Sequence, residues 1–188
     1  RLGTLDLDDV LSLLDWVARV DVTKPSRQIL SPSVPTTQKV LRFTDTWMAP
    51  MRNQISGYDA SEGTLYVLFA LALALHPRAP LFFAIDNFDP AMHPRLARAL
   101  TRLFCRLVLE SDPPRQVLLT THNPLVLDGL DLTNDAIRLF AVERGLETAG
   151  ATDVHRVQVS ESVLDAREDG LSLSNLWIMG RLGGVPRL

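Results

Sequence analysis

The feature that most constrains this chain is an apolar run, residues 81–87, that ends in a carboxylate and a carboxamide. The run places Leu, Phe, Phe, Ala and Ile before Asp86 and Asn87, with no alternation of polar and apolar residues. A short run of this kind is typical of a strand buried on both faces, as in a parallel sheet. An acid at the end of such a strand lies where open α/β sheets bind ligands. Capping of a following helix explains Asp86 equally well when that residue is taken alone.

Composition limits the class of protein. The 188 residues suit one domain, or one domain with an appendage, and 46% hydrophobic residues suffice for a substantial core. A net charge of −3 gives no overall basic footprint, so a DNA contact would be local or supplied by a partner. The single cysteine, Cys105, excludes a disulfide within the chain. With no membrane-spanning run and no leader at the start, we expect a cytoplasmic protein with no membrane partner.

The first 57 residues predict a helix followed by a Pro-rich connection. Residues 5–20 place apolar side chains near a 3.6-residue period and predict an amphipathic helix. Residues 23–38 contain three prolines, which exclude a helix interior or a central strand, so an exposed loop is expected. A short strand is expected over residues 39–44, whereas residues 47–56 show no pattern that assigns them.

A second informative stretch begins at Gly57 and opens onto a helix. The apolar residues 65–75 predict a helix buried nearly all round, with Ser61 as its N-cap. A helix start with glycine and hydroxyl side chains presents unpaired N–H groups and the positive end of the helix dipole, which together form an anion site. Ordinary capping by Ser61 explains the same residues without any ligand.

After Asn87, a turn leads into a helix predicted over residues 95–110. Leucines line one side of this helix and arginines line the other, namely Arg95, Arg98, Arg102 and Arg106. A solvated face explains the arginines better than a DNA patch does in an acidic chain. Residues 116–121 then predict a second buried strand, which ends at His122.

The centre of the chain is therefore predicted as helix, strand, helix, strand. In a parallel sheet with right-handed crossovers both strand ends lie at one edge, so Asp86 and His122 can converge. An acid suits a magnesium shell, and a histidine can hydrogen-bond a transferring phosphoryl group. Together with the helix start at Ser61, these residues predict a phosphate site.

Three motifs, in order and on the predicted elements, resemble the signature, the Walker B strand with its D-loop, and the switch histidine of ABC-type ATPases. They are Ser61-Glu62-Gly63-Thr64, the run 81–87 followed by Asp89, His93 and Pro94, and Thr121-His122-Asn123-Pro124. The chain most resembles the AAA-15/AAA-21 branch, which holds RecF-, SMC- and overcoming-lysogenization-defect-like ATPases. The resemblance covers about residues 58–128, and residues 173–186 resemble the end of such proteins weakly.

This resemblance implies an α/β fold, namely the C-terminal lobe of an ABC-type ATPase head of the P-loop NTPase class, with a mainly parallel sheet flanked by helices. It divides the chain into residues 1–57, part of the helical and signature lobe, residues 58–142, the ATPase core, and residues 143–188, an extension with an edge strand and a helix. The Walker A loop, Gly-x-x-x-x-Gly-Lys-[Ser/Thr], is absent from the sequence. We therefore expect this chain alone to bind ATP poorly. The start at Arg1, without Met, favours a fragment whose Walker A lobe lies elsewhere in a longer protein or on another polypeptide.

The resemblance also implies ATP and Mg²⁺ as cofactors. The nucleotide-binding residues would be Ser61, Glu62, Gly63 and Thr64, facing the γ-phosphate of a nucleotide held by a second ATPase protomer. Asp86 would order the water shell of Mg²⁺, and His122 would hydrogen-bond the γ-phosphate. Residues 89–92 would cross the dimer interface. Nucleotide binding would then be coupled to assembly of a homodimer or higher oligomer.

Asn87 departs from the family pattern, which normally has a catalytic Glu at this position. Asn can orient a water but cannot accept its proton, and loss of a general base costs about 10²- to 10⁴-fold in rate. Three interpretations stay open: a naturally slow ATPase that works as a nucleotide-gated clamp, replacement of the base by Asp89, or a substitution made to trap ATP. We favour the first, with Asn87, Asp89 and His122 as the catalytic residues.

Two functional classes follow. In the first, ATP closes a dimer and controls an attached effector, commonly a nuclease, on DNA in phage defence or DNA repair. In the second, the chain is a pseudo-ATPase module for assembly that binds nucleotide without turnover. An independent metal nuclease that uses Asp86 and Asp89 fits less well, because the further acid of a two-metal site is missing unless Glu62 serves.

Past Asp128 the pattern is weaker. Residues 136–142 and 154–159 predict strands that extend the sheet edge, and residues 171–179 predict a short helix after a helix or loop over 160–170. His155 has no second ligand at a metal-binding spacing in the sequence, so it is interpreted as a surface residue.

Overall fold

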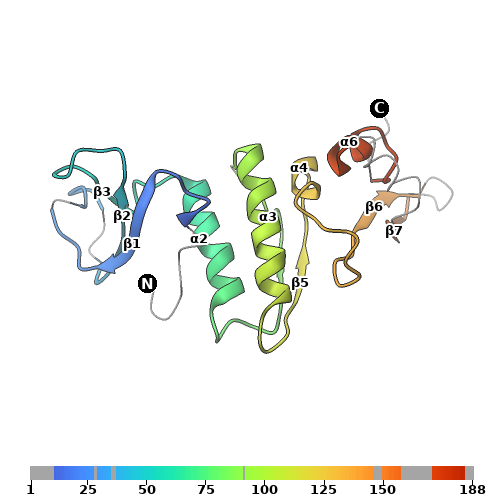
Figure 1. Ribbon diagram of the computed structural model, residues 1–188, viewed down its shortest axis with the longest axis horizontal. Helices are drawn as coiled ribbons and strands as arrows, with labels where there is room; N and C mark the ends of the chain where they lie inside the picture. The colour runs from blue at the N-terminus through green and yellow to red at the C-terminus, as the bar shows by residue number, and fades with distance from the viewer. Residues whose placement is uncertain are drawn as a thin grey trace. The chain divides into compact units, whose positions relative to one another are not determined.

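The computed structural model describes residues 11–27, 29–34, 37–90, 92–145, 150–157 and 171–184. It has an α/β architecture, and helices alternate with strands through the middle of the chain (Figure 1). The chain divides into two compact units, Arg1–Phe82 with Ser111–Arg115, and Phe83–Glu110 with Gln116–Leu188. Among the described residues, no helix is long and apolar enough to cross a membrane.

The first unit contains an antiparallel sheet with the strand order β1-β2-β3. The strands are Val17–Thr23, Val40–Asp45 and Gln54–Ser56. The predicted strand over 39–44 is confirmed as β2, and β3 lies in the stretch that the sequence did not assign. Phe43 is fully buried in this sheet, and Trp16 packs against it with ring centroids 5.8 Å apart.

The strand β1 contradicts the helix predicted over residues 5–20, the first part of which lies outside the described residues. Val17 and Val20 are both buried although they are three positions apart, because the register shifts between Val17 and Arg19. An irregularity of this kind interrupts the two-residue alternation of a strand. The resulting spacing imitates a helical period, which explains why the prediction was wrong.

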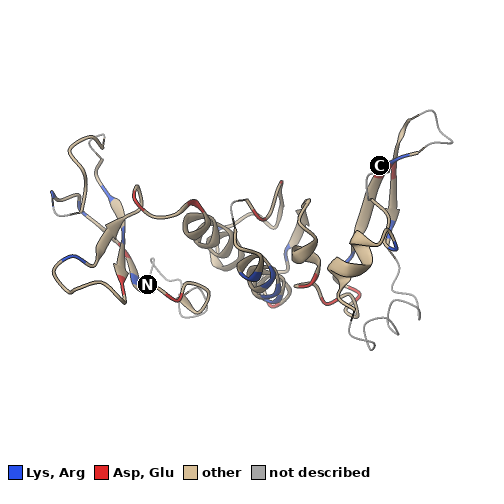
Figure 2. Cartoon of the chain, turned by 90° about the horizontal axis from the view of Figure 1, so that it is seen from above, with Lys and Arg blue, Asp and Glu red and all other residues tan. Residues whose placement is uncertain are grey.

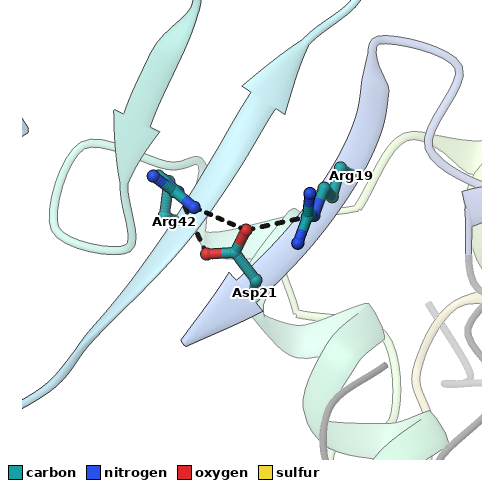
Figure 3. Close-up of polar contacts among 3 residues, drawn as sticks. All are labelled: Arg19, Asp21 and Arg42. Carbon is teal, nitrogen blue, oxygen red and sulfur yellow. Dashed lines mark hydrogen bonds and ion pairs between the residues drawn. The ribbon is translucent and has the colours of Figure 1, made fainter. Parts of the chain in front are cut away.

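Asp21 on β1 and Arg42 on β2 are register partners and form a two-point ion pair (Figure 3). Nε and Nη2 of Arg42 donate to the two Asp21 carboxylate oxygens at 3.0 and 2.8 Å, and Arg19 approaches the same carboxylate at 3.2 Å. The hydrogen bond to Asp21 raises the pKa of Arg42 above its usual value. Because the Asp21 side chain is only 14% exposed, the pair fixes the register of β1 and β2 more firmly than an exposed pair would.

The helix α2, Glu62–Leu75, begins at the predicted N-cap, Ser61. Its buried side includes Val67, Leu71 and Ala74, but Phe69 is 52% exposed, so the helix is not buried all round. At its C-terminal end the Arg115 guanidinium donates to the carbonyls of Ala74 and His76. A cation bonded to the last carbonyls of a helix stabilises that end.

The strand β4, Phe82–Ile85, lies in the second unit from Phe83 onward. It pairs with β5, Gln116–Leu119, and α3, Pro94–Leu109, connects the two strands. Both predicted strands and the predicted helix are thus present. Phe104 of α3 packs against the rings of Phe88 and Phe83, with centroids 5.0 and 6.4 Å away. The four arginines predicted on one side of α3 are all exposed. Figure 2 marks Lys and Arg positions along the chain in blue.

One prediction about these strands is wrong, namely burial on both faces. Phe82 on β4 is 62% exposed and Leu118 on β5 is 54% exposed, whereas Ile85 is buried. The two strands therefore have one exposed face and one covered face in this chain. On the covered face, the ring of Phe83 on β4 packs against the ring of Phe104 on α3. The absence of polar alternation in the sequence concealed this difference between the faces.

The last part of the second unit consists of α4, Pro124–Leu127, α6, Leu173–Ile178, and a hairpin of β6, Phe140–Arg144, with β7, Thr152–Arg156. A leucine cluster packs α4 and α6 together and comprises Leu127, Leu132, Leu173, Leu176 and Leu182. The predicted short helix over 171–179 is confirmed by α6. Residues 160–170 lie outside the described residues.

Contrary to prediction, β6 and β7 do not extend the sheet of β4 and β5. Among the described strands they pair only with each other, in a two-stranded sheet of their own. The division at residues 57 and 142 stays a prediction.

Candidate functional site

The predicted signature residues lie at the start of α2, in the first unit. The Ser61 hydroxyl accepts from the Thr64 N–H at 3.2 Å and lies 2.8 Å from the Thr64 hydroxyl. Ser61 and Glu62 are exposed, whereas Gly63 and Thr64 are buried. This local geometry is that of an ordinary N-cap. A nucleotide-binding role for Ser61, Glu62, Gly63 and Thr64 stays a prediction.

The ends of β4 and β5 meet in the second unit, where hydroxyls after β5 hold acids after β4. The Thr120 hydroxyl donates to Asp86 Oδ1 and accepts from the Asn87 N–H at 3.0 Å. The Thr121 hydroxyl donates to Asp89 Oδ1 at 2.6 Å. We call these five residues the strand-end cluster. The structure thus brings together three of the predicted site residues, all from the Walker B and D-loop segment.

Asn87 has an unusual backbone conformation. Its φ is +52°, and it is the one non-glycine residue with positive φ in the described part of the chain. On either side of it, Ile85 O accepts from the Thr120 N–H at 3.0 Å and the Phe88 N–H donates to Thr120 O at 2.9 Å. The chain therefore kinks at Asn87, between two backbone hydrogen bonds that both involve Thr120. Asn tolerates this left-handed region better than most side chains, which gives a structural reason for Asn at this position.

The predicted switch-histidine motif contains two residues with local hydrogen bonds and one exposed residue. The Thr121 hydroxyl accepts from the Asn123 N–H at 3.0 Å, and Asn123 Oδ1 accepts from the Leu125 N–H at 3.0 Å as the N-cap of α4. His122, between them, is exposed. Asn123 thus orders the start of α4, and His122 projects from an ordered turn.

The acids of the strand-end cluster fit a water-mediated magnesium site. The Asp86 carboxylate is exposed, and one of its oxygens is oriented by Thr120. Mg²⁺ keeps several waters and is usually bound through one or two carboxylates. Three side chains that could ligate a metal ion directly lie elsewhere. Among the described residues, only Glu143, Asp153 and His155 bring three such ligand atoms within 4.8 Å of one another.

Thr120 is the residue that the sequence motifs did not single out. Its position immediately before Thr121-His122 gave a weak signal, because threonine is common in strands for packing reasons alone. Only the pairing of β4 and β5 shows that its hydroxyl serves both Asp86 and Asn87.

Residues 49–128 match a protein family described as "AAA domain, putative AbiEii toxin, Type IV TA system". The matched segment contains α2, β4, α3 and β5, and the match supports a nucleotide-binding ATPase of the AAA class. These residues are less than half of the chain, and over them the sequence is similar to the AAA-21 family. The family recognised from the sequence motifs is confirmed.

One solved structure, of an SMC ATPase described for its ATP-driven dimerization and DNA-stimulated activation, aligns with this chain at 11% identity and a TM-score of 0.48. The alignment covers 86% of this chain and 88% of the other. No curated protein matches the chain significantly.

Proposed function

We propose that this chain supplies the signature, Walker B and switch-histidine parts of an ABC-type ATPase head, and that it hydrolyses ATP slowly once a Walker A lobe completes the site. The family match over residues 49–128 carries this proposal. The strand-end cluster supports it, because one hydroxyl, that of Thr120, orients the two residues that follow the Walker B strand. We further propose that ATP drives dimerisation and thereby controls a DNA-directed effector in phage defence or repair, an extension that rests on the sequence resemblance.

The sheet direction that this fold requires is supported by the bonds of Thr120. Its N–H bonds to Ile85, the last residue of β4, and its C=O bonds to Phe88, three residues further along the chain. A parallel ladder has this pattern, whereas an antiparallel pair exchanges both bonds with one opposite residue. The helix α3 between β4 and β5 is the crossover that parallel strands need.

In this proposal each residue has a distinct task. Asp86 orders the water shell of Mg²⁺, an ion that when bound neutralises charge on the phosphates. Asn87 orients the attacking water but cannot take its proton, so turnover is slow. His122 donates a hydrogen bond to the γ-phosphate from its exposed position. Ser61 and its neighbours in the signature face the nucleotide of the opposite protomer.

The alternative function, a pseudo-ATPase that binds nucleotide without turnover, is favoured by the backbone of Asn87. A left-handed conformation at φ +52° suits Asn, whereas a non-glycine residue without a short polar side chain is strained there by about 1–3 kcal/mol. The kink therefore disfavours the glutamate that catalysis needs. Under this alternative the strand-end cluster serves binding and assembly alone.

The test compares the two threonines of the strand-end cluster in a complex reconstituted with a Walker A segment. Thr120→Val removes the hydroxyl bonded to Asp86, and Thr121→Val removes the hydroxyl bonded to Asp89. We expect Mg-ATP hydrolysis to fall about 10- to 100-fold in Thr120→Val, the usual effect of losing a group that orients a metal-binding residue. Thr121→Val should change it less. The opposite order would move the base to Asp89.

Two further measurements separate the proposed functions. Asn87→Glu should accelerate hydrolysis, and a wild-type complex that binds ATP with no turnover at all would establish the pseudo-ATPase.

Mg-ATP-dependent dimerisation is measured by sedimentation, with Ser61→Arg and His122→Ala as variants expected to weaken it. If ATP produces no dimer in the wild type, the shared-site proposal is wrong.

A further inference from the structure

Three side chains gather on the β6–β7 hairpin, outside the strand-end cluster. Glu143 on β6 is the register partner of Asp153 on β7. His155 lies two positions further along β7, so its side chain shares a face with Asp153. One ligand atom from each residue lies within 4.8 Å of the other two. We call these three residues the hairpin cluster.

The spacing inside the hairpin cluster suits a metal ion better than a hydrogen bond. His155 Nδ1 and Glu143 Oε1 are 3.9 Å apart, which exceeds the roughly 2.7–3.2 Å of an N–H···O bond. Ligand atoms bound at about 2.1 Å in a tetrahedral site lie about 3.4 Å from one another. A small inward movement of these side chains would therefore seat an ion.

The charges of the hairpin cluster favour a divalent cation. Like charges directly opposite each other on neighbouring strands are destabilising, and Glu143 and Asp153 are such a pair. A neutral imidazole offers a lone pair but no positive charge. A bound divalent cation would cancel both negative charges and use that lone pair.

Two glycines near the C-terminal end of the described chain orient the hairpin cluster. The Gly184 N–H donates to Glu143 Oε2 at 3.3 Å, on the oxygen that does not face His155. Gly183 has φ +76°, and a Cβ added there would lie 2.7 Å from His155 Nε2. The backbone therefore closes against one edge of the imidazole, and Nδ1 faces Glu143.

We propose that the hairpin cluster binds one divalent transition-metal ion of the Zn²⁺ type, with the Glu143 and Asp153 carboxylates and His155 Nδ1 as ligands. An imidazole ligand favours such ions over Mg²⁺ and Ca²⁺, which prefer oxygen alone. The ion joins β6 to β7, and through the Glu143 contact with Gly184 it holds the chain at residues 183–184. This site is independent of ATP hydrolysis.

The test is calorimetric titration of the full chain with Zn²⁺, in the absence of nucleotide and Mg²⁺. We expect one ion per chain, with affinity at least tenfold weaker in Asp153→Asn and in His155→Ala. Matched controls are Asp135→Asn and His76→Ala, which change an exposed carboxylate and an exposed imidazole elsewhere. Both controls should bind as the wild type does.

A further variant, Asp86→Asn, separates the hairpin cluster from the strand-end cluster and should leave Zn²⁺ binding unchanged. Far-UV circular dichroism establishes that each variant is folded, and Asp153→Asn keeps the shape of the side chain it replaces. Absence of a bound ion, equal affinity in wild type and both hairpin variants, or loss of binding only in Asp86→Asn would each overturn the proposal.

Discussion

The strand-end cluster and the hairpin cluster each place two carboxylates in a small region of the second unit, but different groups hold them. At the strand ends, Asp86 and Asp89 each accept from a threonine hydroxyl. In the hairpin, Glu143 and Asp153 face each other across the strands beside an imidazole. A hydroxyl orients a carboxylate without cancelling its charge. Under our two proposals, the first arrangement presents oriented negative charge to a cation that arrives with a substrate, whereas the second holds a resident ion.

The largest effect that we predict separates the clusters by activity. Asp86→Asn in the reconstituted complex should lower Mg-ATP hydrolysis about 10- to 100-fold, because an amide oxygen binds the magnesium shell more weakly than a carboxylate does. Asp135→Asn, at an exposed position outside both clusters, should leave the rate unchanged. Steady-state phosphate release measures both. Equal rates for Asp86→Asn and the wild type would remove Asp86 from the metal shell.

A third carboxylate in the second unit, that of Asp128, has a structural role and belongs to neither cluster. Asp128, at the end of α4, accepts from the N–H of Ser174 at 2.9 Å and from its hydroxyl at 2.8 Å, and Ser174 is only 4% exposed. Asp128→Ala leaves a buried donor unsatisfied and should lower the free energy of unfolding by about 1–3 kcal/mol in urea titration. Asp135→Ala should stay within about 0.5 kcal/mol of the wild type. Equal losses in the two variants would contradict the structural role of Asp128.

The parts of this molecule that could be predicted from sequence are those whose signal is local. The start of α2 at Ser61 and the helix α3 follow from capping residues and a 3.6-residue period. The strand β1 was missed because an irregularity at Val17 gave a false helical spacing. Thr120 and the hairpin cluster depend on which strands pair and in which register, and a shift of one residue in register would turn each side chain to the other face.

The kink at Asn87 could not be predicted from the sequence either. An apolar run that ends in Asp-Asn indicates a strand end but not a positive φ at the second polar residue. The family pattern made Asn87 a missing base, and the backbone adds that Asn is the side chain suited to that conformation. Asn87 therefore has two interpretations: it lacks the general base that catalysis needs, and it suits the left-handed backbone conformation at this position.

A smaller effect is expected at two glycines that differ only in their surroundings. Gly183 and Gly180 have φ of +76° and +74°, but a Cβ at Gly183 would meet His155 whereas nothing lies within 4 Å at Gly180. Replacing either by Ala should cost about 1 kcal/mol of unfolding free energy from backbone strain. Only Gly183→Ala should also weaken Zn²⁺ binding, since it displaces the imidazole. Equal Zn²⁺ affinity in the two variants would show that Gly183 does not position His155.

An effect of similar size tests a titratable group that is governed by burial rather than by partners, in contrast to both clusters. Burial raises the pKa of the Cys105 thiol to about 11 from an ordinary value of 9.0. In the unfolded chain the thiol ionises first, so the stability of the folded state is unaffected below pH 9 and falls as the pH rises from 9 to 11. At pH 10 the loss should be about 1 kcal/mol. Urea unfolding at pH 8 and pH 10 measures it, and Cys105→Ala, which has no thiol, should lose correspondingly less between the two. An identical loss in both proteins would mean that the thiol of the folded chain titrates like that of the unfolded one.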